Sequence, residues 1–166
     1  MRRLTLILIA CGLMPVGLIS SHALAISSTV GQRRAADLSD SEVRLALAIN
    51  DVRAENGLWG LQLDPILEDV ARARSVDQVS RRHISHVTPE GVTIFDLLDE
   101  AGITFVSAGE NIAESTGIDP VQQAIDGFLQ SPAHRANLLS ASYDHVGVGA
   151  AETPDGITVL TVVFTN

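Results

Sequence analysis

Residues 144–166 read DHVGVGAAETPDGITVLTVVFTN, and this stretch decides the fold class. Its first part, residues 144–151, consists mainly of small and β-branched residues, and its last part, residues 157–165, is a β-branched run. The segment Pro154-Asp155-Gly156 lies between the two parts and has the composition of a tight turn. The pattern predicts an antiparallel β-hairpin near the end of the chain.

The residues before this hairpin have helical periodicity instead. The clearest example follows Asp119-Pro120, where apolar residues from Val121 to Leu129 recur at positions i, i+3, i+4, i+7 and i+8. Start and stop signals predict five helices, over residues 39–56, 64–82, 93–101, 119–130 and 132–138. Short extended pieces are expected at residues 58–63 and 103–106. Helices first and strands last predict an α+β domain with helices packed on a sheet.

The amino-acid composition excludes several classes of function. The chain has 166 residues, 46% of them hydrophobic, which suits one domain with a sizeable core. Its formal charge of −9, from 11 basic and 20 acidic residues, argues against a nucleic-acid binder and against docking on anionic lipid. Every basic residue is Arg, which excludes lysine-based catalysis. Cys11 is the single cysteine, so an internal disulfide or a cysteine zinc cluster is excluded.

The N-terminus has the pattern of an export signal. Arg2 and Arg3 precede a long apolar run, and Ala23-Leu24-Ala25 follows it as a small-x-small cleavage site. We therefore predict a signal peptide over residues 1–25, a flexible lead-in over residues 26–38 and a domain over residues 39–166. An uncleaved N-terminal anchor and a lipoprotein acylated at Cys11 are the alternatives. The expected product is secreted or periplasmic, with no membrane span in the mature form.

Four histidines follow residue 25, and none belongs to an HExxH zinc-protease motif. His83 lies beside two arginines and is expected at the surface, although its spacing from His86 would also allow a shared metal. His86 follows the predicted second helix, where a fold can direct a side chain inward. His134 lies in the short helix of residues 132–138, and His145 is expected to be exposed.

Glu110 lies in a stretch of small residues that we interpret as a loop. There it is either a solvated acid or a partly buried carboxylate that needs a partner. The only tryptophan, Trp59, is expected to cover the edge of the core, with ligand stacking as the alternative.

Three motifs occur in order along the chain: Gly109-Glu110-Asn111-Ile112-Ala113, then Ser131-Pro132-Ala133-His134-Arg135-Ala136-Asn137-Leu138-Leu139, then Val146-Gly147-Val148-Gly149. Together they resemble the bacterial branch of the CAP superfamily. This is the SCP-like extracellular domain, which is shared with cysteine-rich secretory proteins, insect venom antigens and plant pathogenesis-related proteins. The resemblance covers about residues 41–164.

The resemblance implies an α-β-α sandwich with a central antiparallel sheet flanked by helices. It also implies a cleft with two histidines and two acids, in which His86, Glu110 and His134 match three members. Phe128 stands where the eukaryotic pattern has a Trp, and no Glu follows it, so Asp126 and Glu114 are the candidates for the fourth acid. The family's disulfides are absent.

Two imidazoles and a carboxylate form a ligand set that zinc accepts, with a water in the fourth position. Asn111 and Asn137 are expected to shape the cleft through bonds to backbone groups. The resemblance favours an exported binding or interaction module that holds a divalent metal, a small ligand, a lipid or a protein partner. A metal-dependent hydrolase and a structural or stress-related envelope protein are the alternatives. No residue is assigned a catalytic role.

Overall fold

The computed structural model describes residues 39–166. The predicted signal peptide, the lead-in and Cys11 lie outside the described residues. No helix within residues 39–166 combines the length and the apolar character needed to cross a bilayer.

Five helices form where their start signals lie. Ser39 and Glu42 make a reciprocal capping box, and Asp64 and Asp119 each cap a helix that has Pro at its first position. Gly57 follows the first helix with φ +73°, a conformation that favours glycine. The helices are α2 (Asp40–Glu55), α3 (Pro65–Arg81), α4 (Ile94–Glu100), α5 (Pro120–Gln130) and α6 (Pro132–Leu138).

The sheet has four strands in the order β1-β3-β4-β2. The predicted hairpin is confirmed: β3 (His145–Glu152) and β4 (Thr158–Thr165) pair antiparallel, with Val148 opposite Val162. Strand β2 (Ala108–Ser115) pairs antiparallel with the other side of β4 and forms one edge. At the other edge, the two-residue strand β1 (Gln62–Leu63) adds a short parallel pairing to β3.

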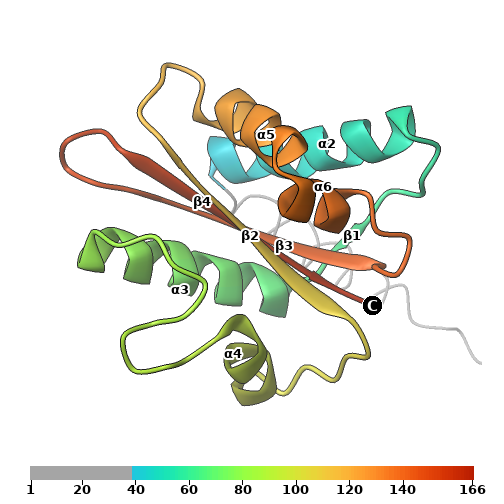
Figure 1. The fold of residues 1–166 in the computed structure, drawn as a ribbon, viewed down its shortest axis with the longest axis horizontal. Helices are drawn as coiled ribbons and strands as arrows, with labels where there is room; N and C mark the ends of the chain where they lie inside the picture. Colours follow the sequence, from blue (N-terminus) through green and yellow to red (C-terminus); the bar gives the residue numbers. More distant parts are fainter. Residues whose placement is uncertain (1–38) are drawn as a thin grey trace, which may run out of the picture. The chain divides into compact units, whose positions relative to one another are not determined.

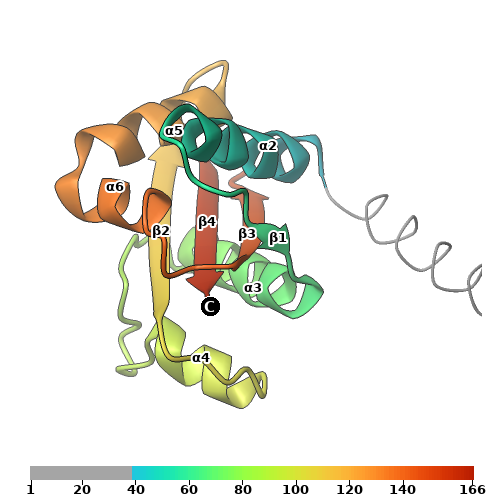
Figure 2. The ribbon, with the colours of Figure 1, turned by 90° about the vertical axis from the view of Figure 1, so that its right-hand side faces the viewer.

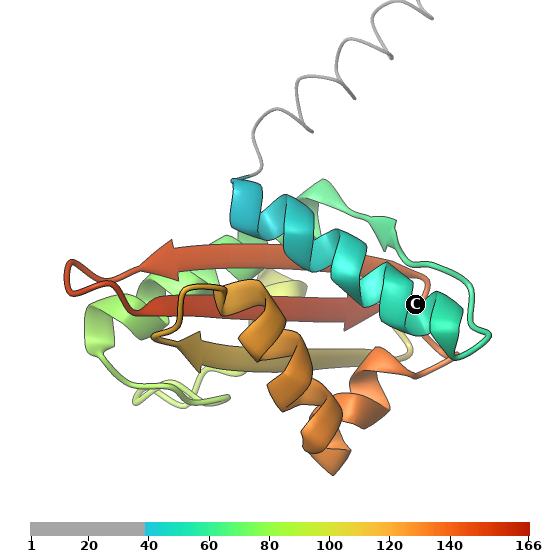
Figure 3. The same ribbon diagram turned by 90° about the horizontal axis from the view of Figure 1, so that it is seen from above.

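The helices cover both faces of the sheet, which confirms the α-β-α sandwich. Helices α2, α5 and α6 lie on one face and α3 and α4 on the other (Figure 1; Figure 2). Seen from above, α2 and α5 cross over the strands (Figure 3). The larger hydrophobic core fills the α2–α5–α6 side around Ile49, Phe128 and Phe164, and a smaller one on the other side includes Leu67 and Leu98.

Helix α3 lies directly on β3 because two glycines leave room for it. A Cβ at Gly147 would collide with the backbone of Leu67, and a Cβ at Gly149 would collide with the backbone of Ala71. The Ser75 hydroxyl then donates to the Gly149 carbonyl at 3.1 Å. The Val-Gly-Val-Gly motif therefore gives the sheet one face of valines and one face that a helix backbone can approach.

Three expectations for residues outside the candidate site are wrong. Residues 103–106 form a loop, because pairing with β4 begins only at Ala108, opposite Thr165. Trp59 is 92% exposed and does not cover the core, whereas Leu61 is 5% exposed and belongs to the larger core. His145 is half-buried, since it lies inside the paired region of β3.

The substitution Gly149→Ala should destabilise the fold, because the added methyl group forces α3 away from β3. Overpacking of this kind costs about 1–3 kcal/mol of unfolding free energy. Urea denaturation of residues 26–166 measures the change. The matched control is Gly127→Ala on α5, where a Cβ meets no atom within 4 Å. That variant should be more stable by about 1 kcal/mol, because alanine is the better helix former. Equal stability of the two variants would contradict the close packing.

Candidate functional site

The cleft residues come from three elements that meet at the outer strand β2. His86 lies in the loop between α3 and α4, Glu110 on β2 and His134 on α6. Side chains alternate along β2, so Glu110 faces α3 while Asn111 faces α6. The two imidazole rings approach each other with centroids 6.0 Å apart and an interplanar angle of 55°.

Glu110 is a buried carboxylate on β2, and both of its oxygens have partners. Its Oε1 accepts from Nε of Arg74 at 2.9 Å, and its Oε2 lies 2.7 Å from Nδ1 of His86. The side chains of Arg74 and Glu110 are each 2% exposed, whereas that of His86 is 56% exposed. Because an ionised carboxylate only accepts hydrogen bonds, Nδ1 of His86 must donate. The Nε2 atom of the neutral ring then keeps its lone pair.

His134 packs against a core side chain and is bonded through its backbone. The Phe128 ring lies edge-on to the imidazole with centroids 5.4 Å apart, and Nδ2 of Asn111 donates to the His134 carbonyl at 3.0 Å. Asn137 donates from its own Nδ2 to Oδ1 of Asn111 at 2.8 Å and to the Glu110 carbonyl at 3.3 Å. The two asparagines therefore connect α6 to β2 beside the cleft.

A pocket of about 370 Å³ opens beside His86. Glu110 and Asn137 line it on the polar side, and Val87, Ile94 and Phe95 contribute apolar surface. A ligand bound at His86 therefore has a partly apolar space next to it.

The two histidines differ in proton affinity. The hydrogen bond that His86 donates to Glu110 raises the pKa of His86, and the carboxylate charge adds to this, while burial and the charge of Arg74 oppose it. Burial lowers the pKa of His134, and the neighbouring charge of His86 lowers it further. On acidification His86 is protonated first and His134 resists protonation.

Both candidates for the fourth acid lie away from the two rings. Glu114 shares a face of β2 with Glu110 but is four residues further along, which is about 13 Å in a strand. It lines a different pocket, with His83. Asp126 is exposed and accepts from Nε2 of Gln122 on its own helix. Within residues 39–166, no group of three or more His, Cys, Asp and Glu side chains is arranged to hold a metal ion.

Arg74 is not among the candidate residues predicted from the sequence, although its side chain is buried in the site. The missed signal is the order Leu67, Ala71, Arg74 and Gln78, in which helical core spacing continues into polar residues that are buried. Glu110 is predicted in a loop but lies on a strand, because the small residues around it belong to a buried sheet edge.

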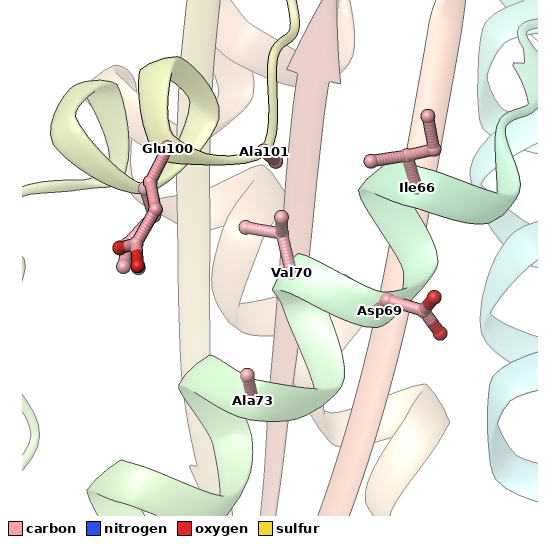
Figure 4. A pocket seen from close by; sticks show the side chains of 7 residues that line it. Ile66, Asp69, Val70, Ala73, Glu100 and Ala101 are labelled. Carbon is pink, nitrogen blue, oxygen red and sulfur yellow. The ribbon is translucent and has the colours of Figure 1, made fainter.

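A separate groove of about 280 Å³ lies between α3 and α4, with Val70 and Ala73 on α3 and Ala101 just after α4 (Figure 4). Its charged lining residues are Asp69 and Glu100. It shares no lining residue with the His86 pocket.

Residues 47–165 match the model of the cysteine-rich secretory protein family, CAP. A relative in Bacillus subtilis, the uncharacterized protein YkwD, is 33% identical over 116 residues, which are 70% of this chain and 44% of that protein. The chain therefore spans less than half the length of this relative.

Solved structures show the same fold. An outer surface protein of Borrelia burgdorferi has a TM-score of 0.71 at 24% identity, covering 78% of this chain and 95% of that one. An extracellular protein with an SCP domain from Bacillus anthracis has a TM-score of 0.64 at 29% identity, covering 76% and 40%. A structure of NaASP2 with Zn²⁺ has a TM-score of 0.53 at 12% identity, covering 76% and 80%, and shows a likeness of fold alone.

The substitution Glu110→Gln should lower the pKa of His86, because it removes the carboxylate that stabilises the imidazolium. A histidine whose pKa is higher in the folded than in the unfolded state stabilises the fold. The contribution is complete at a pH below the unfolded-state pKa of about 6.5, and it disappears as the pH rises through the folded-state pKa. The advantage of the wild type over the variant in free energy of unfolding, as far as it depends on His86, should therefore be largest at acidic pH. NMR titration of the imidazoles and urea denaturation across the same pH range measure both effects.

The control for this experiment is Glu114→Gln, on the same face of the same strand. It should leave the titration of His86 as in the wild type, because the two groups are about 13 Å apart along the strand. If both variants shift His86 equally, the contact with Glu110 is not the cause.

Proposed function

The chain belongs to the cysteine-rich secretory protein family, CAP, and from that premise we propose that it is an exported binding module whose His86–His134 cleft holds a divalent metal ion or a small ligand. One observation carries the proposal. The two rings lie 6.0 Å apart, and the Nδ1 atom of His86 is occupied by a buried carboxylate. This leaves the Nε2 atom available to a ligand in the cleft.

The donor set fits zinc through the two histidines. Imidazole nitrogens are common zinc ligands, and two of them on one tetrahedral ion have ring centroids roughly 5 Å apart, which is close to the observed spacing. Metal-bound histidines usually donate their other N–H to a carboxylate or a carbonyl. Glu110 supplies that carboxylate for His86, so it orients the ligand and does not bind the metal itself. A bound zinc would supply a positive charge that attracts an anionic or polar ligand.

Binding is proposed ahead of hydrolysis for a chemical reason. A metal-dependent hydrolase needs a base that can take a proton from bound water. Within residues 39–166, the carboxylate that contacts His86 is Glu110, and its oxygens are engaged by Arg74 and His86. The arrangement therefore suits holding a ligand better than turning one over.

Export is proposed from two independent features. Residues 1–25 have the pattern of a signal peptide. The similar proteins from Borrelia burgdorferi and Bacillus anthracis are an outer surface protein and an extracellular protein. Both features favour a site of action outside the cytoplasm.

Zinc binding should depend on both cleft histidines. Residues 26–166, purified free of metal, should bind one equivalent of zinc in isothermal titration calorimetry near pH 7.5, and the double variant His86→Ala/His134→Ala should not. Lowering the pH to about 5.5 should weaken binding by the wild type, because protons compete for the imidazole nitrogens.

The matched control is His83→Ala, which removes an exposed histidine three residues from His86. This variant should bind zinc as the wild type does. Equal binding by the wild type and the double variant would disprove a metal site in the cleft.

A further inference from the structure

Two buried polar side chains of α3 hold the segment that carries His86. We propose that Arg74 and Gln78 are positioning residues, which fix the His86 imidazole in the orientation that binds a ligand. This inference rests on the proposed function of the cleft. Arg74 acts through Ser85 and Glu110, and Gln78 acts through Ser85.

Gln78 binds the peptide backbone immediately before His86. Its Nε2 donates to the Ser85 carbonyl at 2.8 Å, and its Oε1 accepts from the Ser85 N–H at 2.9 Å. The side-chain amide therefore makes the same pair of bonds that a neighbouring strand would make. With Gln78 only 2% exposed, this pair of bonds is shielded from competing water.

Arg74 joins the backbone of this loop to the carboxylate partner of His86. Its Nε donates to Oε1 of Glu110 at 2.9 Å, while one of its terminal nitrogens donates to the Ser85 carbonyl at 2.8 Å. The planar guanidinium fixes the angle between these two bonds, which a lysine ammonium cannot do. One rigid group thus sets both the position of the His86 backbone and the direction of the Glu110 carboxylate.

The spacing of these residues on α3 explains how the two contacts combine. Arg74 and Gln78 are four residues apart and lie on the same helix face. Both donate to the one carbonyl of Ser85, which has two lone pairs and can accept both bonds. The helix is itself fixed against β3 at Gly147 and Gly149. The position of His86 is therefore fixed relative to the rigid sheet, although His86 lies in a loop.

Stability alone does not account for a buried arginine here. Replacing a buried ion pair by apolar side chains of similar size is often neutral or stabilising, because both charges lose their hydration on burial. An apolar pair would not direct Oε2 of Glu110 toward His86 or hold Ser85. The cost of burying Arg74 and Glu110 is understandable if the pair orients the imidazole.

The experiment compares Gln78→Met, Arg74→Met and Arg74→Lys in residues 26–166. Zinc chloride titrations well below the unfolding temperature should show about 10-fold or greater weakening for both methionine variants, as is typical when a residue that orients a metal ligand is lost. Arg74→Lys should recover part of the affinity, because it restores one charged donor. The matched control is Arg72→Met on the same helix α3, which breaks the ion pair of Arg72 with Glu42 of α2. It should lower stability without changing zinc affinity.

A second readout uses the metal-free protein. In the methionine variants, amide hydrogen exchange should accelerate at Ser85 more than at β4, and the long-range ¹H–¹⁵N spectrum of His86 should move from the Nδ1–H form toward a mixture of tautomers. Wild-type zinc affinity together with an unchanged His86 spectrum in both methionine variants would overturn the inference. If the wild type itself fails to bind zinc, the proposed metal function fails, and the exchange and tautomer data still decide the positioning role. If Arg74→Met does not fold, Gln78→Met and Arg74→Lys decide it.

Discussion

The contact between the α3 backbone and the two glycines of β3 is the constraint on which the cleft depends. Gly147 and Gly149 let the helix lie against the strand more closely than any side chain would allow. At that depth Arg74 reaches the Glu110 carboxylate on the far strand of the sheet, and Gln78 reaches the loop beyond the helix. A shift of α3 away from the sheet would therefore move His86 as well as open the core.

Strand β2 links the two halves of the cleft because its side chains alternate. Glu110 contacts Arg74 of α3 and the His86 imidazole. The next residue, Asn111, donates to the backbone carbonyl of His134 in the opposite layer. Adjacent residues of one strand thus bring together two histidines that come from opposite faces of a sheet. The same arrangement separates their pKa values, because one imidazole faces a carboxylate and the other faces Phe128.

The fold could be predicted well from local signals. Capping residues, proline starts and the final hairpin all act over a few residues, so their chemistry is visible in the chain itself. The errors arose where a distant partner decides the outcome. The acid at residue 110 lies on a strand because the distant strand β4 pairs with it, and residues 103–106 form a loop because that pairing begins only at Ala108.

The sequence by itself determined the five helices and the final hairpin, because capping and turn signals are local properties. The layered fold and the candidate residues His86, Glu110 and His134 came from the resemblance of three ordered motifs to the CAP superfamily, whereas strand β2 was not predicted. Only the tertiary structure decided what these residues contact. Arg74 is 36 positions from Glu110 along the chain, and no local sequence pattern predicts that the two residues pair. Burial of that pair leaves both oxygens of Glu110 engaged, one by Arg74 and the other by His86, because the fold brings helix α3 and the His86 loop to the same carboxylate.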